Sequence, residues 1–282
     1  MPVLSPILGV DIGGTKIASA RVDNGAKVSG FGTVPTLASS GLEVSLGQVW
    51  RAIENALTPE VEAIGIAGPG PLDPRAGIVL NPPNLPGWRN LSLARLARER
   101  FGLPVTLEND GNAAALAEAV YGAGRGYAEV FYATIGTGIG SGIVLDGKIF
   151  HGAHGAGAEC GHMSIDYRSA IQCACGAAGC VEALASGPVF DDAEEEELDE
   201  LVGRLGAWLG GVLSLLDPGI VVIGGGVAQM GEPLLGRLRA TAPRWTVNPH
   251  ASAIPIVPAE LGVEAGVVGA ATVAARALGG LH

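Results

Sequence analysis

Three of the four cysteines in this chain lie within eight residues, in the stretch CACGAAGC from Cys173 to Cys180. His162 precedes them in the short motif GHM. One imidazole and three thiolates form a usual tetrahedral ligand set for a structural zinc ion. Gly176 and Gly179 allow the loop to fold tightly around such an ion. The sequence therefore predicts a metal site made of His162, Cys173, Cys175 and Cys180.

Other interpretations of the same residues stay open on the sequence alone. The cysteines could be small buried side chains, with His162 unrelated to them. His151 and His154 are alternative ligands, although they lie further from the cluster. Cys160 is interpreted as a small buried side chain and not as a ligand. A disulfide between Cys173 and Cys175 would be strained, since one residue separates them.

The pattern of apolar segments around the cluster predicts an α/β protein built from two related halves. In the first half we expect strands at 7–11, 17–23 and 27–34, a helix over 42–57 and a strand at 61–68. The dipeptide NG between the second and third strands is a strong hairpin signal. In the second half we expect strands at 130–135, 142–147 and 148–150, a helix over 197–216, a strand at 219–226, another helix, a strand at 253–258 and a helix over 264–278.

The two halves also match in sequence where each begins. When DIGGTKIASARVD is laid over TIGTGIGSGIVLD, Ile12 meets Ile135, Gly13 meets Gly136 and Asp23 meets Asp146. Each half therefore opens with a glycine-rich hairpin. Glycines at such a tip let backbone N–H groups point at one anion without interference from Cβ atoms. Two such tips across a cleft could hold the phosphates of a nucleotide, although either one alone could be a plain tight turn.

Side chains beside the tips suit the same ligand. Thr15, Thr134 and Thr137 offer hydroxyl donors, and Lys16 offsets phosphate charge. Asp11 ends the first strand, where it could hold Mg²⁺ through water. Neither tip is a Walker A loop or a dinucleotide fingerprint. The predicted nucleotide-binding residues are Asp11, Gly13, Gly14, Thr15, Lys16, Thr134, Gly136, Thr137 and Gly138.

Composition limits the classes of function. The chain has 282 residues, 48% of them hydrophobic, which is enough for a large core. Its net charge of −11 argues against a nucleic-acid partner, because such proteins show a basic footprint. The first residues do not have the pattern of a signal peptide, and no apolar run is long enough for a membrane helix. We therefore expect a cytoplasmic protein with no membrane partner.

Taken together, the motifs DIGGTK, ENDGNAAALAE, GTGIGSGIVLDGKIFHGAHGAGAECGH, CACGAAGCVEALASG and VVIGGGV resemble those of the ROK sugar kinases. The resemblance covers nearly the whole chain. It implies two actin-like (ribonuclease H-like) domains around a cleft, with a zinc-binding loop. The expected N-terminal domain is 1–118, with the last helix, 264–282, packed onto it, and the expected C-terminal domain is 119–263.

The resemblance also implies roles for particular residues. Asp110 corresponds to the catalytic base, and Gly224, Gly225 and Gly226 to the turn on the adenosine side of ATP. The sugar-binding residues that it implies are Asn84, Asn109, Asp110, Glu159, His162 and Glu182. The zinc ion would then fix Glu159 and Glu182, which flank its ligands. Taken singly, Asp110 could be a helix N-cap, NPPNLPGW a plain proline-rich loop and Glu182 a solvated helix residue.

The implied activity is ATP-dependent phosphorylation of a hexose, with glucose giving glucose 6-phosphate. The implied cofactors are structural Zn²⁺, Mg²⁺ and ATP, and the implied assembly is a homodimer or homotetramer. The alternatives are an N-acetylmannosamine or N-acetylglucosamine kinase, or a non-catalytic sugar sensor. A repressor of the same family is disfavoured, because it carries a helix-turn-helix domain before the first strand. The segment 187–200 departs from the family by being short; its acidic run is expected to cap a helix and face water.

Overall fold

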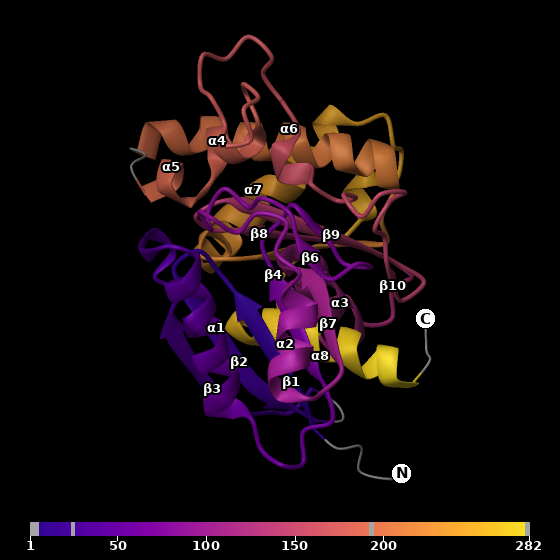
Figure 1. Cartoon of the computed structure of the whole chain (residues 1–282). Coiled ribbons are helices and arrows are strands. Elements are labelled where there is room, and N and C mark those ends of the chain that lie inside the picture. Colours follow the sequence, from indigo (N-terminus) through magenta and orange to yellow (C-terminus); the bar gives the residue numbers. More distant parts are fainter. Residues whose placement is uncertain (1–5, 24–25, 192–194, 280–282) are drawn as a thin grey trace. The chain divides into compact units, whose positions relative to one another are not determined.

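The structure is a computed structural model that describes residues 6–23, 26–191 and 195–279. Its internal contacts divide the chain into two compact units. Unit 1 contains the chain up to Ala117, the segment Phe150–Gly157 and the chain from Val263 onward. Unit 2 contains Glu118–Ile149 and Ala158–Gly262. Each unit is an α/β body with its own five-stranded sheet (Figure 1).

The sheet of unit 1 has the strand order β3-β2-β1-β4-β7. The strands β1 (Ile7–Ile12), β2 (Lys16–Val22) and β3 (Val28–Pro35) form an antiparallel meander, as the alternating pattern predicts. The strands β4 (Ile64–Gly68) and β7 (Val105–Asn109) extend it in parallel with β1. A short hairpin of β5 (Leu72–Asp73) and β6 (Ile78–Val79) follows β4.

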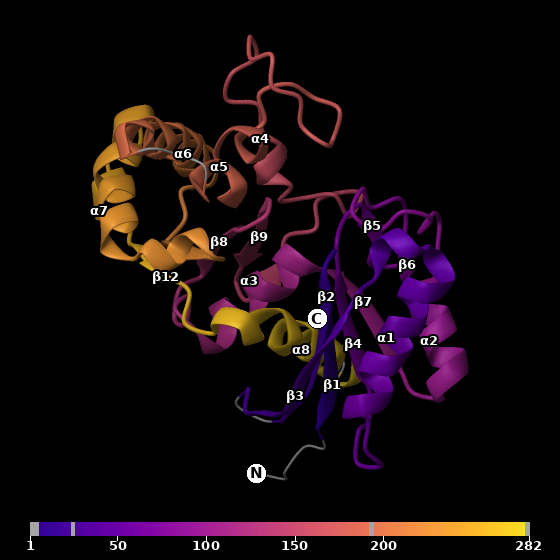
Figure 2. The same cartoon turned by 90° about the vertical axis from the view of Figure 1, so that its left-hand side faces the viewer.

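Helices cover both faces of this sheet. The helices α1 (Leu42–Ala56) and α2 (Leu93–Phe101) pack on one face, and α8 (Ala265–Gly279) lies on the other, as Figure 2 shows. Glycines in β1 and β4 permit a close approach of α8: a Cβ on Gly9 would lie 2.0 Å from the carbonyl oxygen of Val267, and one on Gly65 would lie 1.9 Å from that of Ala270. The final helix is therefore an integral layer of unit 1.

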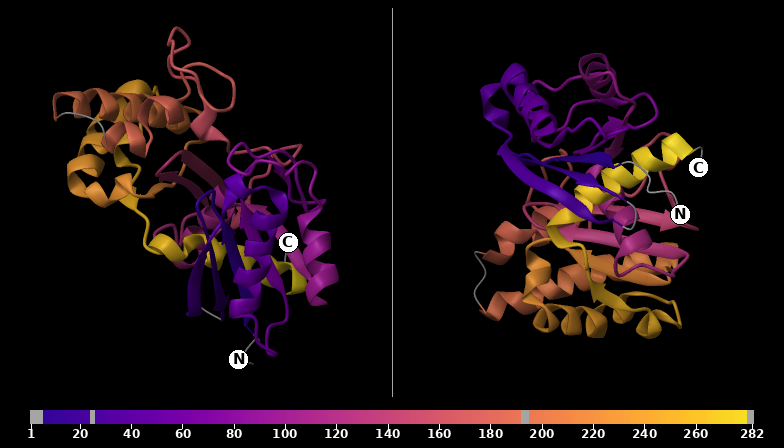
Figure 3. Two further views of the ribbon diagram at one scale, coloured as in Figure 1. Left: turned by 60° about the vertical axis from the view of Figure 1, so that its left-hand side comes forward. Right: turned by 90° about the horizontal axis from the view of Figure 1, so that it is seen from below.

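The sheet of unit 2 has the order β10-β9-β8-β11-β12. Its strands are β8 (Glu129–Ile135), β9 (Ile139–Leu145), β10 (Lys148–Ile149), β11 (Ile220–Gly224) and β12 (Ile256–Pro258). The helices α6 (Glu195–Leu216) and α7 (Glu232–Thr241) pack side by side on one face (Figure 3), where Phe131 meets Trp208 edge-on at 5.9 Å between ring centroids. The short helices α4 (Val181–Ala185) and α5 (Gly187–Asp191) precede α6.

The two sheets share one topology, which confirms the prediction of two related halves. In each sheet, the first strand pairs antiparallel with the second and parallel with the fourth. Ile12 and Ile135 end equivalent strands. The hairpins differ in length, because Ile12 pairs with Ile17 whereas Ile135 pairs with Ile139. The second tip is thus one residue shorter.

One segment departs from the expected domain boundaries. Residues 150–157 fall in the stretch that the sequence assigned to the second domain, yet they belong to unit 1. The physical reason is a hydrogen bond between His151 and Glu108, described below, and packing of Gly155 near Pro74. The helix α3 (Asp110–Tyr121) also runs from unit 1 into unit 2.

The described part of the acidic segment faces water. Residues 192–194 of the acidic run lie outside the described residues; further along, Asp199 and Glu200 are strongly exposed, in line with a water-facing run. Among the described residues, no helix has both the length and the apolar character needed to cross a membrane.

Candidate active site

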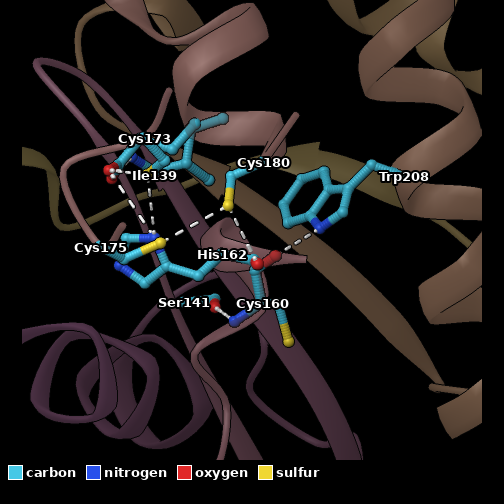
Figure 4. Close-up of polar contacts among 9 residues, drawn as sticks. Ile139, Ser141, Cys160, His162, Cys173, Cys175, Cys180 and Trp208 are labelled. Atoms are coloured by element: carbon cyan, nitrogen blue, oxygen red, sulfur yellow. Dashed lines mark hydrogen bonds and ion pairs between the residues drawn. The ribbon is translucent and has the colours of Figure 1, made fainter. Parts of the chain in front are cut away.

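The structure brings the four predicted metal ligands together in unit 2. The Nδ1 or Nε2 atom of His162 and the Sγ atoms of the three cysteines all lie within 4.8 Å of one another. His162 Nδ1 lies 3.5 Å from Cys173 Sγ, and Cys175 Sγ lies 3.6 Å from Cys180 Sγ (Figure 4). Tetrahedral zinc with Zn–S bonds of about 2.3 Å separates its ligand atoms by about 3.5–3.8 Å. The cluster therefore has the dimensions of a zinc site.

The alternative ligands are elsewhere. His151 hydrogen-bonds Glu108 in unit 1, and His154 is exposed in the same segment of that unit. The thiol of Cys160 points away from the other sulfurs (Figure 4), which agrees with its interpretation as a non-ligand. Burial raises the pKa of the Cys180 thiol to about 12, so this sulfur needs a nearby cation to become a thiolate.

The turn that carries Glu159 and His162 is fixed from two sides. It forms the 3₁₀ helix η2 (Cys160–His162). The Cys160 N–H donates to Ser141 Oγ on β9 at 3.0 Å, and Trp208 Nε1 on α6 donates to the Cys160 carbonyl at 2.9 Å. A Cβ on Gly161 would lie 1.9 Å from the Ile139 carbonyl oxygen, so this position requires glycine for the turn to rest on β9. The η2 turn, which carries the predicted ligand His162, is therefore in direct contact with β9 of the second hairpin.

Glu182 joins these parts. It lies in the first turn of α4, two residues after the predicted ligand Cys180. Its Oε2 accepts the Ile139 N–H at 2.9 Å, and its Oε1 lies 3.7 Å from Cys173 Sγ and 3.9 Å from His162 Nδ1. Its side chain is only 24% exposed. The interpretation of Glu182 as a solvated helix residue is therefore wrong.

Glu159, the residue before η2, interacts electrostatically with His162 and Glu182. Desolvation by its neighbours raises the pKa of this carboxyl, His162 opposes the rise, and the charge of Glu182 adds to it. The two carboxylates thus influence one another electrostatically. Such a pair, next to an imidazole, can accept several hydroxyl hydrogen bonds at once.

The second glycine hairpin and the GGG turn lie at the same edge of the unit 2 sheet. Thr134, near the end of β8, pairs with Gly224, at the end of β11. A Cβ on Gly225 would lie 2.3 Å from the Ile135 carbonyl oxygen, and its φ is +85°. The Gly136 N–H is bonded to the Gly138 carbonyl inside the turn. The amides of Thr137 and Gly138 make no hydrogen bond within the described parts of the chain, so these two can face an anion.

The first hairpin in unit 1 is built in a similar way. The Gly13 N–H donates to the Lys16 carbonyl, and buried Thr36 clamps the turn by donating its hydroxyl to the Gly13 carbonyl at 2.7 Å. The amides of Gly14 and Thr15 make no hydrogen bond within the described ranges. Of the predicted backbone donors, those of Gly13 and Gly136 are therefore used inside their own turns, whereas those of Gly14, Thr15, Thr137 and Gly138 are not.

Asp11 and Asn84 flank this first tip. Asp11 is half-buried at the end of β1, and burial raises the pKa of its carboxyl to about 6, with Lys16 opposing the rise. Asn84 is exposed, and its Cβ would lie 3.3 Å from a Cβ on Gly14. The segment NPPNLPGW is anchored in the core by Leu85 and by Trp88, whose Nε1 donates to Ser45 Oγ at 2.8 Å. It is thus an ordered support for Asn84.

Asn109 and Asp110 form the junction between β7 and α3 in unit 1. Asn109 Oδ1 accepts the Asn112 N–H at 3.1 Å, which is the bond of a helix N-cap. Asp110 Oδ1 accepts the adjacent Gly111 N–H at 2.8 Å, and α3 begins at Asp110 itself. The capping role proposed for Asp110 is therefore performed by its neighbour, which leaves the capping hypothesis without its main support.

The sequence profile of the ROK family matches residues 7–204 and 191–277. The chain belongs to the ROK family. It is 32% identical to the glucokinase of Thermotoga maritima over 319 aligned positions, which cover 99% of this chain and all of that protein. It is 35% identical to the N-acetylmannosamine kinase of Salmonella agona over 191 positions, or 68% of this chain and 65% of that protein.

A solved structure extends the likeness to the fold. The ROK family glucokinase from Streptomyces griseus, in complex with glucose and AMPPNP, is 33% identical, with a TM-score of 0.83 over 96% of this chain and 99% of that one. The two sheets of equal topology are therefore those of the actin-like fold, as the sequence resemblance implied.

Sequence reasoning gave no role to Glu108 and considered His151 only as an alternative metal ligand, although both lie within the ROK motifs. Glu108 precedes Asn109 and is almost completely buried, and His151 lies 2.7 Å from it. Besides its place in the ENDGNAAALAE motif, the sequence signal for Glu108 is an acidic residue that follows Val, Thr and Leu in β7. Such a position predicts a buried carboxylate that needs partners, but not which partners.

Proposed function

We propose that this chain is an ATP-dependent hexose kinase that transfers the γ-phosphoryl group of ATP to glucose, giving glucose 6-phosphate. The observation that carries the proposal is the β7–α3 junction, where Asn109 caps the helix and Asp110 is not needed for that purpose. A carboxylate at this place can accept the proton of an attacking sugar hydroxyl. The ROK glucokinases to which the chain is similar support this role.

The sugar hydroxyls are assigned to a set of polar side chains in both units. In unit 1 these are Asn84, Asn109 and Asp110; in unit 2 they are Glu159, His162 and Glu182. Carboxylates and amides suit this task, because each can pair with two hydroxyls at once. The rigid support of η2 by Ser141 and Trp208 keeps Glu159 and His162 in place without the sugar.

ATP is assigned to the glycine-rich segments. The amides of Gly14, Thr15, Thr137 and Gly138 would face its phosphates, and the turn Gly224–Gly226 the adenosine. Thr134 and Lys16 support the same sites with a hydroxyl and a positive charge. Mg²⁺, held through water by Asp11, would neutralise charge on the phosphates. Among the residues present, a half-buried carboxylate next to the hairpin tip fits such an ion.

Zinc is assigned to His162, Cys173, Cys175 and Cys180. All four ligand atoms come from the protein, so the ion would hold structure and would not take part in the reaction. Self-association as a homodimer or homotetramer is part of the proposal. Adjacent exposed side chains of unit 2, Leu215, Trp245 and Val247, provide apolar surface for it, and sedimentation measurements test it.

An N-acetylhexosamine kinase is the second candidate, favoured by the likeness to an N-acetylmannosamine kinase. One ATP-coupled assay across glucose, mannose, fructose, N-acetylglucosamine and N-acetylmannosamine separates the two. We expect the largest kcat/KM with glucose. Turnover on none of these sugars would leave the sensor as the better description.

The variant Asp110→Asn tests the base directly. It keeps the shape of the side chain but removes the proton acceptor, so kcat should fall by about 10²- to 10⁴-fold. The melting temperature and zinc content should stay at the wild-type values, because capping depends on Asn109. Wild-type turnover of this variant on every sugar would remove Asp110 from the mechanism.

A further inference from the structure

His151, which is partly buried, and Glu108, which is buried, form a pair beside the proposed catalytic junction. The two residues are 43 positions apart, and both belong to unit 1. His151 Nε2 lies 2.7 Å from Glu108 Oε2. The Glu108 side chain is 3% exposed and that of His151 is 29% exposed. A carboxylate in such a place is stable only when donors surround it.

The second oxygen of Glu108 leads to the junction itself. Glu108 Oε1 accepts the Asn109 N–H at 2.9 Å and the Asn112 Nδ2 amide at 3.1 Å. Asn112 in turn donates its own N–H to Asn109 Oδ1. The carboxylate therefore holds the backbone immediately before Asp110 and the first turn of the helix that begins there.

The electrostatic surroundings favour a charged imidazole. The hydrogen bond to Glu108 raises the pKa of His151; burial opposes this rise, the charge of Glu108 adds to it, and Arg75, in the turn between β5 and β6, lowers it. A protonated imidazole makes a short, charge-assisted bond to a carboxylate, which is stronger than a neutral one.

We propose that His151 is a positioning residue for the reaction, which acts by fixing Glu108 and, through it, the Asn109–Asp110 junction. The inference rests on the proposed function, in which Asp110 is the base. Without the imidazole, Glu108 Oε2 would lose its donor in a buried place, and the carboxylate would rotate toward water. The junction would then lose two hydrogen bonds that set the direction of Asp110.

The segment 150–157 gives this pair a further consequence. It leads directly along the chain to Glu159, in the motif that we assign to sugar binding. The bond between His151 and Glu108 thus ties the segment that precedes Glu159 to strand β7. Sequence distance alone does not reveal this link.

The test compares three variants of the full-length protein with bound metal. His151→Ala removes the donor, His151→Gln keeps an amide donor, and His154→Ala is the control in the same segment. Misplacement of a catalytic group by about 1 Å can lower a rate by about 100-fold. We expect kcat with glucose to fall about 10- to 100-fold in His151→Ala, with the KM for ATP within about twofold. His151→Gln should recover at least a third of the loss on a logarithmic scale, and His154→Ala should behave as wild type.

A double-mutant cycle with Glu108→Gln decides whether His151 acts through Glu108. If it does, the doubly substituted protein should have about the kcat of the slower single variant, and not the product of the two losses. The wild-type kcat should also decline as the pH rises through the raised pKa of His151, and this decline should vanish in His151→Gln. The pH profile and the cycle report positioning when each kcat is divided by the concentration of folded protein, measured by circular dichroism.

The outcomes separate this inference from the proposed function. An inactive wild type, or an Asp110→Asn variant with full activity, refutes the function. An active wild type whose His151→Ala variant keeps its kcat refutes the positioning role alone. Multiplicative losses in the cycle also refute it, as does a decrease in kcat that matches the fraction of unfolded protein measured by circular dichroism.

Discussion

Asp11 provides a sharp test of the proposed nucleotide site. The negative charge that it would need to hold Mg²⁺ lowers the stability of the folded protein. Asp11 is the next-to-last residue of β1, and a Cβ on Gly266 at the start of α8 would lie 2.3 Å from its Oδ2. Burial raises the pKa of Asp11 from 3.8 to about 6. A raised carboxyl pKa means that the folded state disfavours the charged form. The charge therefore destabilises the folded protein when no metal is bound.

The size of this effect follows from the pKa values. At about 1.4 kcal/mol per pKa unit, the rise corresponds to roughly 3 kcal/mol at pH 8. The stabilising effect of the protonated form is complete below pH 3.8 and is lost as the pH rises through about 6. Asp11→Asn has the same shape and no charge. It should stabilise the metal-free protein by up to about 3 kcal/mol at pH 8 and by about half of that at pH 5.

Denaturant unfolding at pH 5, 6, 7 and 8, without Mg²⁺ but with the zinc site filled, measures this difference. The exposed Asp199→Asn is the control. In thermal unfolding, the Tm of Asp11→Asn should be higher than that of the wild type by on the order of 5 °C at pH 8. Added MgATP should stabilise the wild type more than Asp11→Asn, and kcat of the variant should fall. A variant less stable than wild type at every pH would show that the carboxylate is favourably bonded, and would refute the reasoning.

Three further predictions address other parts of the molecule. A Cβ on Gly136 meets nothing within 4 Å, so Gly136→Val should fold normally, but its branched side chain would crowd a phosphate at the neighbouring Thr137 and Gly138 amides and raise the calorimetric Kd for ATP at least about tenfold; an unchanged Kd would reduce this hairpin to a turn. Cys175→Ser should lose about one zinc ion per chain in metal analysis and raise the KM for glucose about 10- to 100-fold, with a smaller effect on ATP; a zinc-free active wild type would contradict it. Glu118 accepts backbone N–H groups from Ala123, Glu260 and Leu261, so Glu118→Gln should lower the free energy of unfolding by about 2–3 kcal/mol, and an unchanged denaturation midpoint would show that these bonds are dispensable.

Local pattern was sufficient for the main elements of the fold. The alternation at 17–23 and the NG dipeptide placed the β2–β3 hairpin, and the apolar runs at 130–135 and 219–226 placed β8 and β11. Strand β4 begins at Ile64, later than the expected start at 61, because only Ile64–Gly68 pairs with β7. The helix α2, the five-residue strand β7 and the two-residue strands β5 and β6 were not predicted, since none has a long periodic signal.

The site was predictable where its residues are close in sequence. The three cysteines and His162 lie within nineteen residues, and the structure gathers them. The pairing of His151 with Glu108 was not predictable, because it depends on a segment that crosses from one unit to the other. The use of the Gly13 and Gly136 amides inside their own turns also depends on hairpin length, which the glycine pattern leaves open.

Glu182 connects the predicted metal ligands, the proposed sugar site and the hairpin proposed to bind phosphate. One of its oxygens accepts the Ile139 N–H, and the other lies beside two of the metal ligands. An ion in the cluster would therefore fix the carboxylate, and the carboxylate fixes the first residue after the hairpin tip. Loss of the ion should disturb sugar binding first, because Glu182 and Glu159 flank the ligands directly. The effect on ATP is transmitted through one backbone hydrogen bond, and for this reason it should be the smaller of the two.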